Sequence, residues 1–218
     1  MKHACISPIS DHTWRRLVSA STTAAAVGWA SSGVFATAIG PAFTPGSSDT
    51  LLYVGKSGGP LIDDVGVAQD QEVSREATTK WMLGKYNPSA FWVFADLLVP
   101  HRELLAWSNL AKIDTKESGP PQGYRWTQIE EPCVAALGEE MESLKPRRVV
   151  FATSKYQRDA ILRVLQDLGF TRHEVRPELD DTEFFTDADG RLAAITRHPQ
   201  GWRREARDPV AQYIRDWV

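Results

Sequence analysis

Short apolar runs that end at glycine or polar residues alternate along this chain with stretches of helical periodicity. Residues 50–60, TLLYVGKSGGP, predict a buried four-residue strand that leads into a glycine-rich loop. A continuous apolar run of this kind is typical of a parallel strand covered by helices on both faces. Further strands are predicted within 103–113, over 148–153 and over 173–179, together with a hairpin over 184–195 that turns at Asp189-Gly190.

Apolar residues three and four positions apart predict helices over 125–144 and 156–168, with Gly169 closing the second. Residues 81–98 are expected to be helical, at least from Pro88 onward, because Asn87-Pro88 suits a helix start, and Asp208-Pro209 suits the start of the last helix. Residues 61–76 are polar and irregular, so we expect an excursion without regular structure there.

Residues 1–49 are expected to form a helical segment and a loop that pack on the sheet. The alternative is a secretory signal, because Arg15-Arg16 precedes a small-residue, apolar stretch that includes Ala-Thr-Ala at 36–38. Serine and threonine residues interrupt this stretch, which favours packed helices and makes it too polar for a membrane span. We therefore expect a cytoplasmic protein that does not associate with a membrane.

The order of these elements predicts the fold class. Strands that alternate with helices give a three-layer α/β/α sandwich with a central, mostly parallel, four-stranded sheet. A chain of 218 residues is long enough for one such domain with a substantial core. We expect a single domain over residues 1–218, and a monomer.

The amino-acid composition excludes only a few classes of function. The chain is 42% hydrophobic and 24% charged, as in an ordinary globular protein. A net charge of −3 gives no global sign of nucleic-acid binding, although a local basic patch is compatible with it. Two cysteines, Cys5 and Cys133, are too few for a disulfide framework, a cysteine-ligated zinc site or an iron–sulfur cluster. We expect neither a metal nor a cofactor.

Three polar loops follow predicted strands, at 55–60, 108–112 and 197–202. We expect them at one edge of the sheet, because ligands of open α/β sheets bind beyond the carboxyl ends of the strands. Asn109 in the second loop carries an amide that can both donate and accept hydrogen bonds, which a carboxylate cannot do. His198 in the third loop has an N–H that can stabilise a developing oxyanion.

Together, these loops resemble those of the uracil-DNA glycosylase superfamily over about residues 50–205. The resemblance lies in a strand that ends in a glycine loop, in the run LLAWSN at 104–109 and in a final strand followed by His-Pro. It implies a DNA glycosylase that hydrolyses the N-glycosidic bond of uracil or another deaminated base, with DNA as its partner.

The resemblance also assigns roles to residues. The substrate-binding residues would be Gly55, Lys56, Ser57, Phe91, Trp92 and Asn109. The catalytic residues would be His198 and a water-activating carboxylate, for which Asp63 and Asp64 are the nearest candidates. The last loop and its flank would meet DNA through Arg197, Gln200, Trp202, Arg203 and Arg204, with the Trp202 ring as a wedge between bases.

Two departures from the family pattern leave other functions open. Lys56-Ser57-Gly58-Gly59-Pro60 stands where the family places an acidic or amide residue, and Gln200 stands where it has serine. A catalytically inactive member that binds nucleic acid or a nucleotide is therefore an alternative. A third hypothesis is an unrelated α/β hydrolase or transferase that uses Ser57 or Asp63, although no nucleophile elbow is present. A phosphate loop is not expected, because no glycine lies five residues before Gly55.

Each candidate also has a purely structural interpretation. His198 before Pro199 can end a strand by binding a backbone carbonyl, and Asn109 can cap the turn that follows it. The arginines at 203–207 can form a solvated face that pairs with neighbouring carboxylates.

Overall fold

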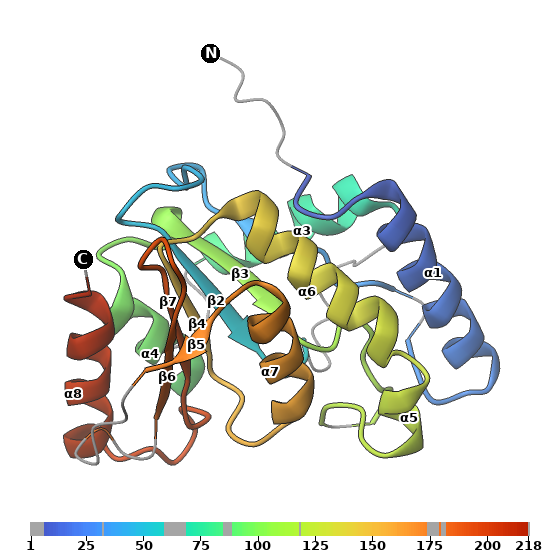
Figure 1. The fold of residues 1–218 in the computed structure, drawn as a ribbon. Helices are drawn as coiled ribbons and strands as arrows, with labels where there is room; N and C mark the ends of the chain where they lie inside the picture. Colours follow the sequence, from blue (N-terminus) through green and yellow to red (C-terminus); the bar gives the residue numbers. More distant parts are fainter. Residues whose placement is uncertain are drawn as a thin grey trace.

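A mixed seven-stranded sheet runs through the computed structural model of this protein (Figure 1). Residues 7–31, 33–58, 69–84, 89–117, 119–173, 179 and 182–217 are described. The strand order is β1-β3-β2-β4-β7-β6-β5. The strands are β1 (Ala38–Ile39), β2 (Leu51–Gly55), β3 (Leu105–Asn109), β4 (Arg148–Phe151), β5 (Thr171–Arg172), β6 (Glu183–Thr186) and β7 (Leu192–Ile195).

The four central strands, β3, β2, β4 and β7, are parallel to one another. The predicted four-stranded, mostly parallel sheet therefore matches this core but is too small. Antiparallel strands extend both edges, with β1 beside β3, and β6 followed by β5 beside β7. The predicted hairpin is the β6–β7 pair, and Gly190 turns it with φ of +72°. β1 and β5 have only two residues each, too few for an apolar pattern to predict.

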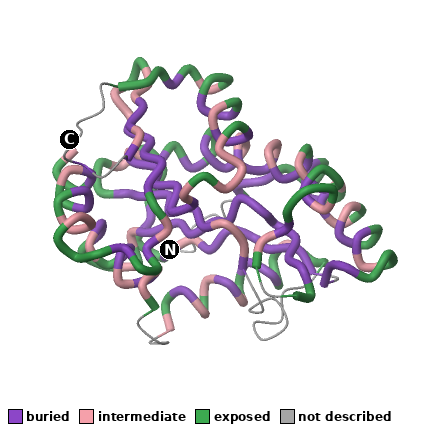
Figure 2. The backbone as a smooth tube through the Cα atoms, turned by 90° about the horizontal axis from the view of Figure 1, so that it is seen from below, coloured by how far each residue is buried: buried purple, intermediate pink, exposed green. Residues whose placement is uncertain are grey.

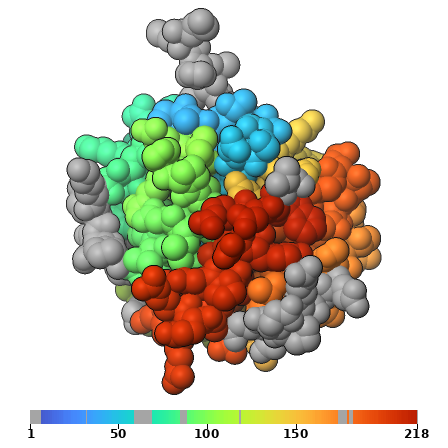
Figure 3. Space-filling view, turned by 90° about the vertical axis from the view of Figure 1, so that its left-hand side faces the viewer, coloured from blue at the N-terminus to red at the C-terminus, as the bar shows by residue number. Residues whose placement is uncertain are grey.

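Helices pack on both faces of the sheet, because successive strand residues point to opposite sides. Leu52 and Val54 of β2 join the core under α1 (Asp11–Ala26), α6 (Glu130–Leu144) and α7 (Arg158–Asp167). Leu51 and Tyr53 join the other core, under α4 (Ala90–Leu98), α8 (Arg204–Arg215) and the end of α3 (Gln71–Leu83). Figure 2 shows the strands buried through the middle of the molecule, and Figure 3 shows α8 in red beside the green segment that contains α4.

The amino-terminal part contains the predicted helix. α1 begins after Ser10, whose hydroxyl accepts a hydrogen bond from the Thr13 N–H, as an N-cap does. Residues 27–31 and 33–37 are not helical, and the chain then enters β1. No helix within the described ranges is long and apolar enough to cross a membrane.

The prediction of an irregular stretch over 61–76 is wrong for its last part. α3 begins after Asp70, whose carboxylate accepts the Val73 N–H at 3.0 Å. Its buried residues include Ser74 and Thr78, whose hydroxyls donate to the carbonyls of Val34 and Ala36. Polar residues anchor this helix, so hydrophobic periodicity did not predict it. Residues 59–68 and the predicted cap Asn87-Pro88 lie outside the described residues.

The remaining helices differ from the predictions mainly at their ends. The helix predicted over 125–144 is divided into α5 (Tyr124–Thr127) and α6, and a 3-10 helix (Arg102–Leu104) precedes β3. α7 ends as expected, with Gly169 at φ +78°. α8 begins five residues before Pro209, which lies inside it, and Asp208 pairs with the side chains of Arg204 and Arg207 and does not cap the helix. Most of the strand predicted over 173–179 falls outside the described residues.

Candidate functional site

The three predicted loops meet at the carboxyl edge of the parallel strands. Gly55 ends β2 and pairs in register with Asn109 at the end of β3. The pairing continues into the loops, because the Leu110 N–H donates to the Gly55 carbonyl at 2.9 Å. The His198 N–H donates to the Ser154 hydroxyl at 2.7 Å, which ties the loop after β7 to the loop after β4. Hydrogen bonds thus fix the loop backbones at the edge where a ligand would bind.

A pocket of about 250 Å³ opens at this edge. Seven of the predicted substrate and catalytic residues line it, namely Gly55, Lys56, Ser57, Phe91, Trp92, Asn109 and His198. Gly58, Trp81, Ser89, Trp107 and Pro120 complete the described lining. The volume lies just below the range of roughly 300–1,000 Å³ typical of pockets for drug-sized ligands, so the pocket suits a small molecule or one ring system of a larger one.

Aromatic rings form one wall of the pocket. The ring centroid of Trp107 lies 5.0 Å from that of Trp92 and 5.1 Å from that of Trp81. Phe91 packs on Trp92 at 5.2 Å in a T-shaped arrangement and on Tyr53 at 4.4 Å. Rigid aromatic surfaces of this kind bind flat ligands by stacking.

Sequence reasoning missed two of these rings. Trp107 lies two residues before Asn109 on the same strand, so the two-residue period of a strand already placed both on one face. Trp81 had no such signal, because it reaches the pocket only through the packing of α3 beside β1 and β3.

In one of its two orientations, the side-chain amide of Asn109 forms hydrogen bonds through both its nitrogen and its oxygen. Its nitrogen then donates to the Ser108 carbonyl at 3.1 Å and its oxygen accepts the Gly58 N–H at 3.2 Å. An amide nitrogen has two hydrogens and its oxygen has two lone pairs, so one donor and one acceptor remain for a ligand. Asn109, which is only 1% exposed, therefore holds the glycine loop and still has one donor and one acceptor beyond these two bonds.

His198 has a defined tautomer. Its Nδ1 accepts the Gln200 N–H at 3.4 Å, so the ring proton lies on Nε2. Burial and, to a lesser extent, the positive charge of Lys56 lower the pKa of His198 below its ordinary value of 6.5. The site therefore holds a neutral imidazole with one N–H to donate.

Lys56 lies in the same pocket and has no acidic partner among the described residues. Burial lowers its pKa from the ordinary value of 10.5, because removal from water penalises the ammonium form. Its carbonyl accepts the Ala111 N–H at 2.9 Å, which fixes its backbone against the loop after β3. The described lining contains no carboxylate. Asp63 and Asp64, the predicted water-activating residues, lie outside the described residues.

A buried ion pair supports the strand end from which Asn109 projects. Lys112 Nζ lies 2.5 Å from Glu140 Oε1, and both side chains are fully buried. The hydroxyl of Ser108, next to Asn109, accepts from Lys112 and donates to Glu140 Oε2 at 2.7 Å, and the Thr37 hydroxyl also donates to Glu140. These hydrogen bonds fix the backbone beside the pocket from the opposite face of β3.

The predicted DNA-contacting residues divide into two groups. Arg197, Gln200, Arg203 and Arg204 are exposed, and Arg204 pairs with Asp208 at 3.0 Å. Trp202 is only 8% exposed and packs on Phe94 with ring centroids 5.1 Å apart. This burial contradicts the prediction that Trp202 inserts between bases, because the turn before α8 directs the ring into the core beneath α4.

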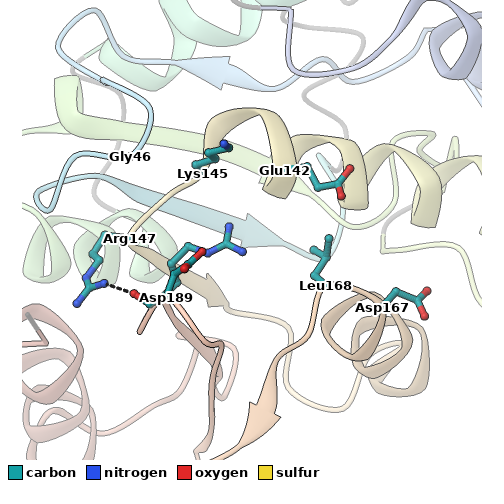
Figure 4. Close-up of a pocket in the computed structure, with 8 residues that line it drawn as sticks. Gly46, Glu142, Lys145, Arg147, Asp167, Leu168 and Asp189 are labelled. Atoms are coloured by element: carbon teal, nitrogen blue, oxygen red, sulfur yellow. Dashed lines mark hydrogen bonds between the residues drawn. The ribbon is translucent and has the colours of Figure 1, made fainter.

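A larger hollow of about 540 Å³ lies at the opposite edge, where the parallel strands begin (Figure 4). Cationic and acidic residues alternate around it, and Arg147 donates to the Asp189 carbonyl at 3.0 Å. Arg191 is paired with Asp187 at 2.5 Å. This hollow is of mixed charge and its described lining has no aromatic residue, so the smaller pocket at the carboxyl edge is the better candidate site.

No protein-family model matches the chain, and no curated protein matches its sequence. The geometry of the pocket is therefore the evidence for function.

Proposed function

We propose that this pocket binds uracil or another deaminated base flipped out of DNA, and that the protein hydrolyses the N-glycosidic bond of that base. One observation carries the proposal: an amide, a neutral imidazole and an aromatic wall, from segments far apart in the chain, line a single pocket of about 250 Å³. Each of the three supplies a different part of what base excision needs.

Asn109 would read the base. Its remaining donor and acceptor match the edge of a uracil ring, which offers both an N–H and a carbonyl oxygen. Phe91 would stack on the ring, since aromatic side chains bind bases through their faces. The bond of the Asn109 amide to the Gly58 N–H would keep the glycine loop close to the base.

His198 would stabilise the leaving group. Cleavage of the bond leaves the electron pair on the base, whose oxygen then carries negative charge. The Nε2–H of a neutral imidazole can donate to that oxygen, and the Gln200 N–H on Nδ1 keeps the proton on Nε2. Arg197, Gln200 and Arg203, from the same loop and its flank, are exposed and would meet DNA phosphates.

A second candidate function is binding without excision. The described lining has no carboxylate to activate water and has a cationic Lys56, which is more typical of a site that holds an anionic nucleotide. An inactive protein of this fold would bind a nucleotide or DNA in the same pocket and release it unchanged.

Excision from a labelled oligonucleotide with a single uracil, in single- and double-stranded form, separates the two. Wild type should release uracil, and His198→Ala and Asn109→Ala should each lower the rate roughly 100-fold or more. Arg172→Ala, an exposed change on the edge strand β5, is the matched control and should leave the rate unchanged. Salt-dependent binding without release would support the second candidate, and absence of both would contradict the proposal for uracil.

A further inference from the structure

Lys56 is an amine in the pocket that hydrolysis by water does not use. It follows the last residue of β2 directly and lines the pocket together with Asn109 and His198. Its positive charge contributes, after burial, to the lowered pKa of His198. Its backbone is fixed by the Ala111 N–H at 2.9 Å, while its side chain of four carbons remains long enough to reach across the pocket.

The surroundings of Lys56 favour a reactive amine. No described carboxylate pairs with it, and partial burial disfavours the charged form. A neutral lysine amine attacks electrophilic carbon and forms imines with carbonyl groups. A base held by Asn109 and His198 would bring the sugar carbon to which it is attached, C1′, to the same pocket.

We propose that Lys56 is a nucleophile toward C1′ of deoxyribose, so that the protein forms a covalent imine with the sugar of a deaminated or abasic nucleotide in DNA. This inference rests on the proposed function and adds a covalent imine intermediate to it. It also supplies a nucleophile where the described lining offers no carboxylate to activate water.

The step balances without an oxidant or reductant. The lone pair of Nζ forms a bond to C1′, and the bond between C1′ and the base breaks with its electron pair on the base, which His198 Nε2–H stabilises and which then takes a proton. The attached nitrogen loses a proton to water, and the C1′–O4′ bond opens with its electron pair on O4′, which is protonated. The protonated imine that remains is hydrolysed by water to the free lysine and an abasic sugar.

Trapping with borohydride tests the inference, because hydride reduces the imine to a stable amine. Full-length protein is mixed with two labelled oligonucleotides, one with a single uracil and one with a preformed abasic site. Wild type should give a covalent complex with both, and mass spectrometry should place the adduct on Lys56. Lys56→Ala and Lys56→Arg should each lower the yield at least about tenfold. Lys155→Ala, at an exposed lysine just after β4, should leave it unchanged.

The outcomes separate the inference from the proposed function. Uracil release without a covalent complex on either oligonucleotide would overturn the role of Lys56 and leave the glycosylase standing. A Lys56 adduct on the abasic oligonucleotide without uracil release would support Lys56 and contradict uracil excision. A complex that persists in both Lys56 variants, or no complex and no release, would overturn the inference. Melting curves show whether Lys56→Ala is folded, and Lys56→Arg keeps the positive charge.

Discussion

Gly55 and Asn109 face each other across the β2–β3 pair so closely that a Cβ at Gly55 would lie 2.5 Å from the Asn109 amide. The same Cβ would lie 3.2 Å from the Phe91 ring. Only glycine leaves room for the amide and the ring to approach this strand end together. The residue that ends β2 therefore sets the position of the two side chains proposed to read and stack the base.

Gly55→Ala should destabilise the protein by roughly 1–3 kcal/mol, because the added methyl group overlaps packed atoms. Denaturant unfolding measures this loss, and base binding should weaken with it as Asn109 moves. Gly138→Ala in α6 is the control, since nothing lies within 4 Å of its Cβ and alanine favours a helix by roughly 0.5–1 kcal/mol. Equal stability of the Gly55 variant and wild type would contradict the close approach.

His198 should make the protein less stable in mild acid. Its pKa is lower in the folded protein than the ordinary 6.5, so below pH 6.5 the unfolded chain takes up a proton more readily than the folded one. The free energy of unfolding should thus fall as the pH falls from about 6.5 through the lowered pKa of the folded state. His198→Ala should reduce this pH dependence in unfolding curves at pH 5 to 8. An unchanged slope would argue against a buried, neutral imidazole.

Lys112→Met should cost roughly 3–5 kcal/mol of stability, because it leaves the buried Glu140 carboxylate without its cation. The double variant Lys112→Met with Glu140→Leu should recover much of that loss, since two apolar side chains leave no buried charge. Unfolding in urea of these two variants, of Glu140→Leu alone and of wild type measures the coupling. Additive losses in the double variant would mean that the two side chains do not interact.

Trp202→Ala should destabilise the protein by roughly 3–5 kcal/mol, because the ring packs in the core against Phe94. Trp202→Phe should cost less, since the buried Trp202 Nε1 has no hydrogen-bond partner to lose. DNA affinity of the folded Trp202→Phe variant should equal that of wild type. If this variant lost DNA affinity without losing stability, the hypothesis that Trp202 inserts between bases would again be supported.

The local pattern of apolar and polar residues was sufficient to predict the strands and helices that bury apolar side chains. The runs at β2, β3 and β4 and the apolar stripe of α7 were predicted because strand and helix periods are properties of the chain itself. The same pattern also predicted that Gly55, Asn109 and His198 lie together, because the carboxyl ends of parallel strands meet at one edge of a sheet.

What the sequence alone determined is therefore the parallel core and the edge that bears the site. Only the tertiary structure decided the two-residue edge strands, the start of α3 in a polar stretch and the Lys112–Glu140 pair. It also decided that Trp81 lines the pocket and that Trp202 is buried. These features depend on partners tens of residues away, and no local period marks such partners. Hydrogen bonds and ring contacts between distant segments form only once the sheet has brought those segments together.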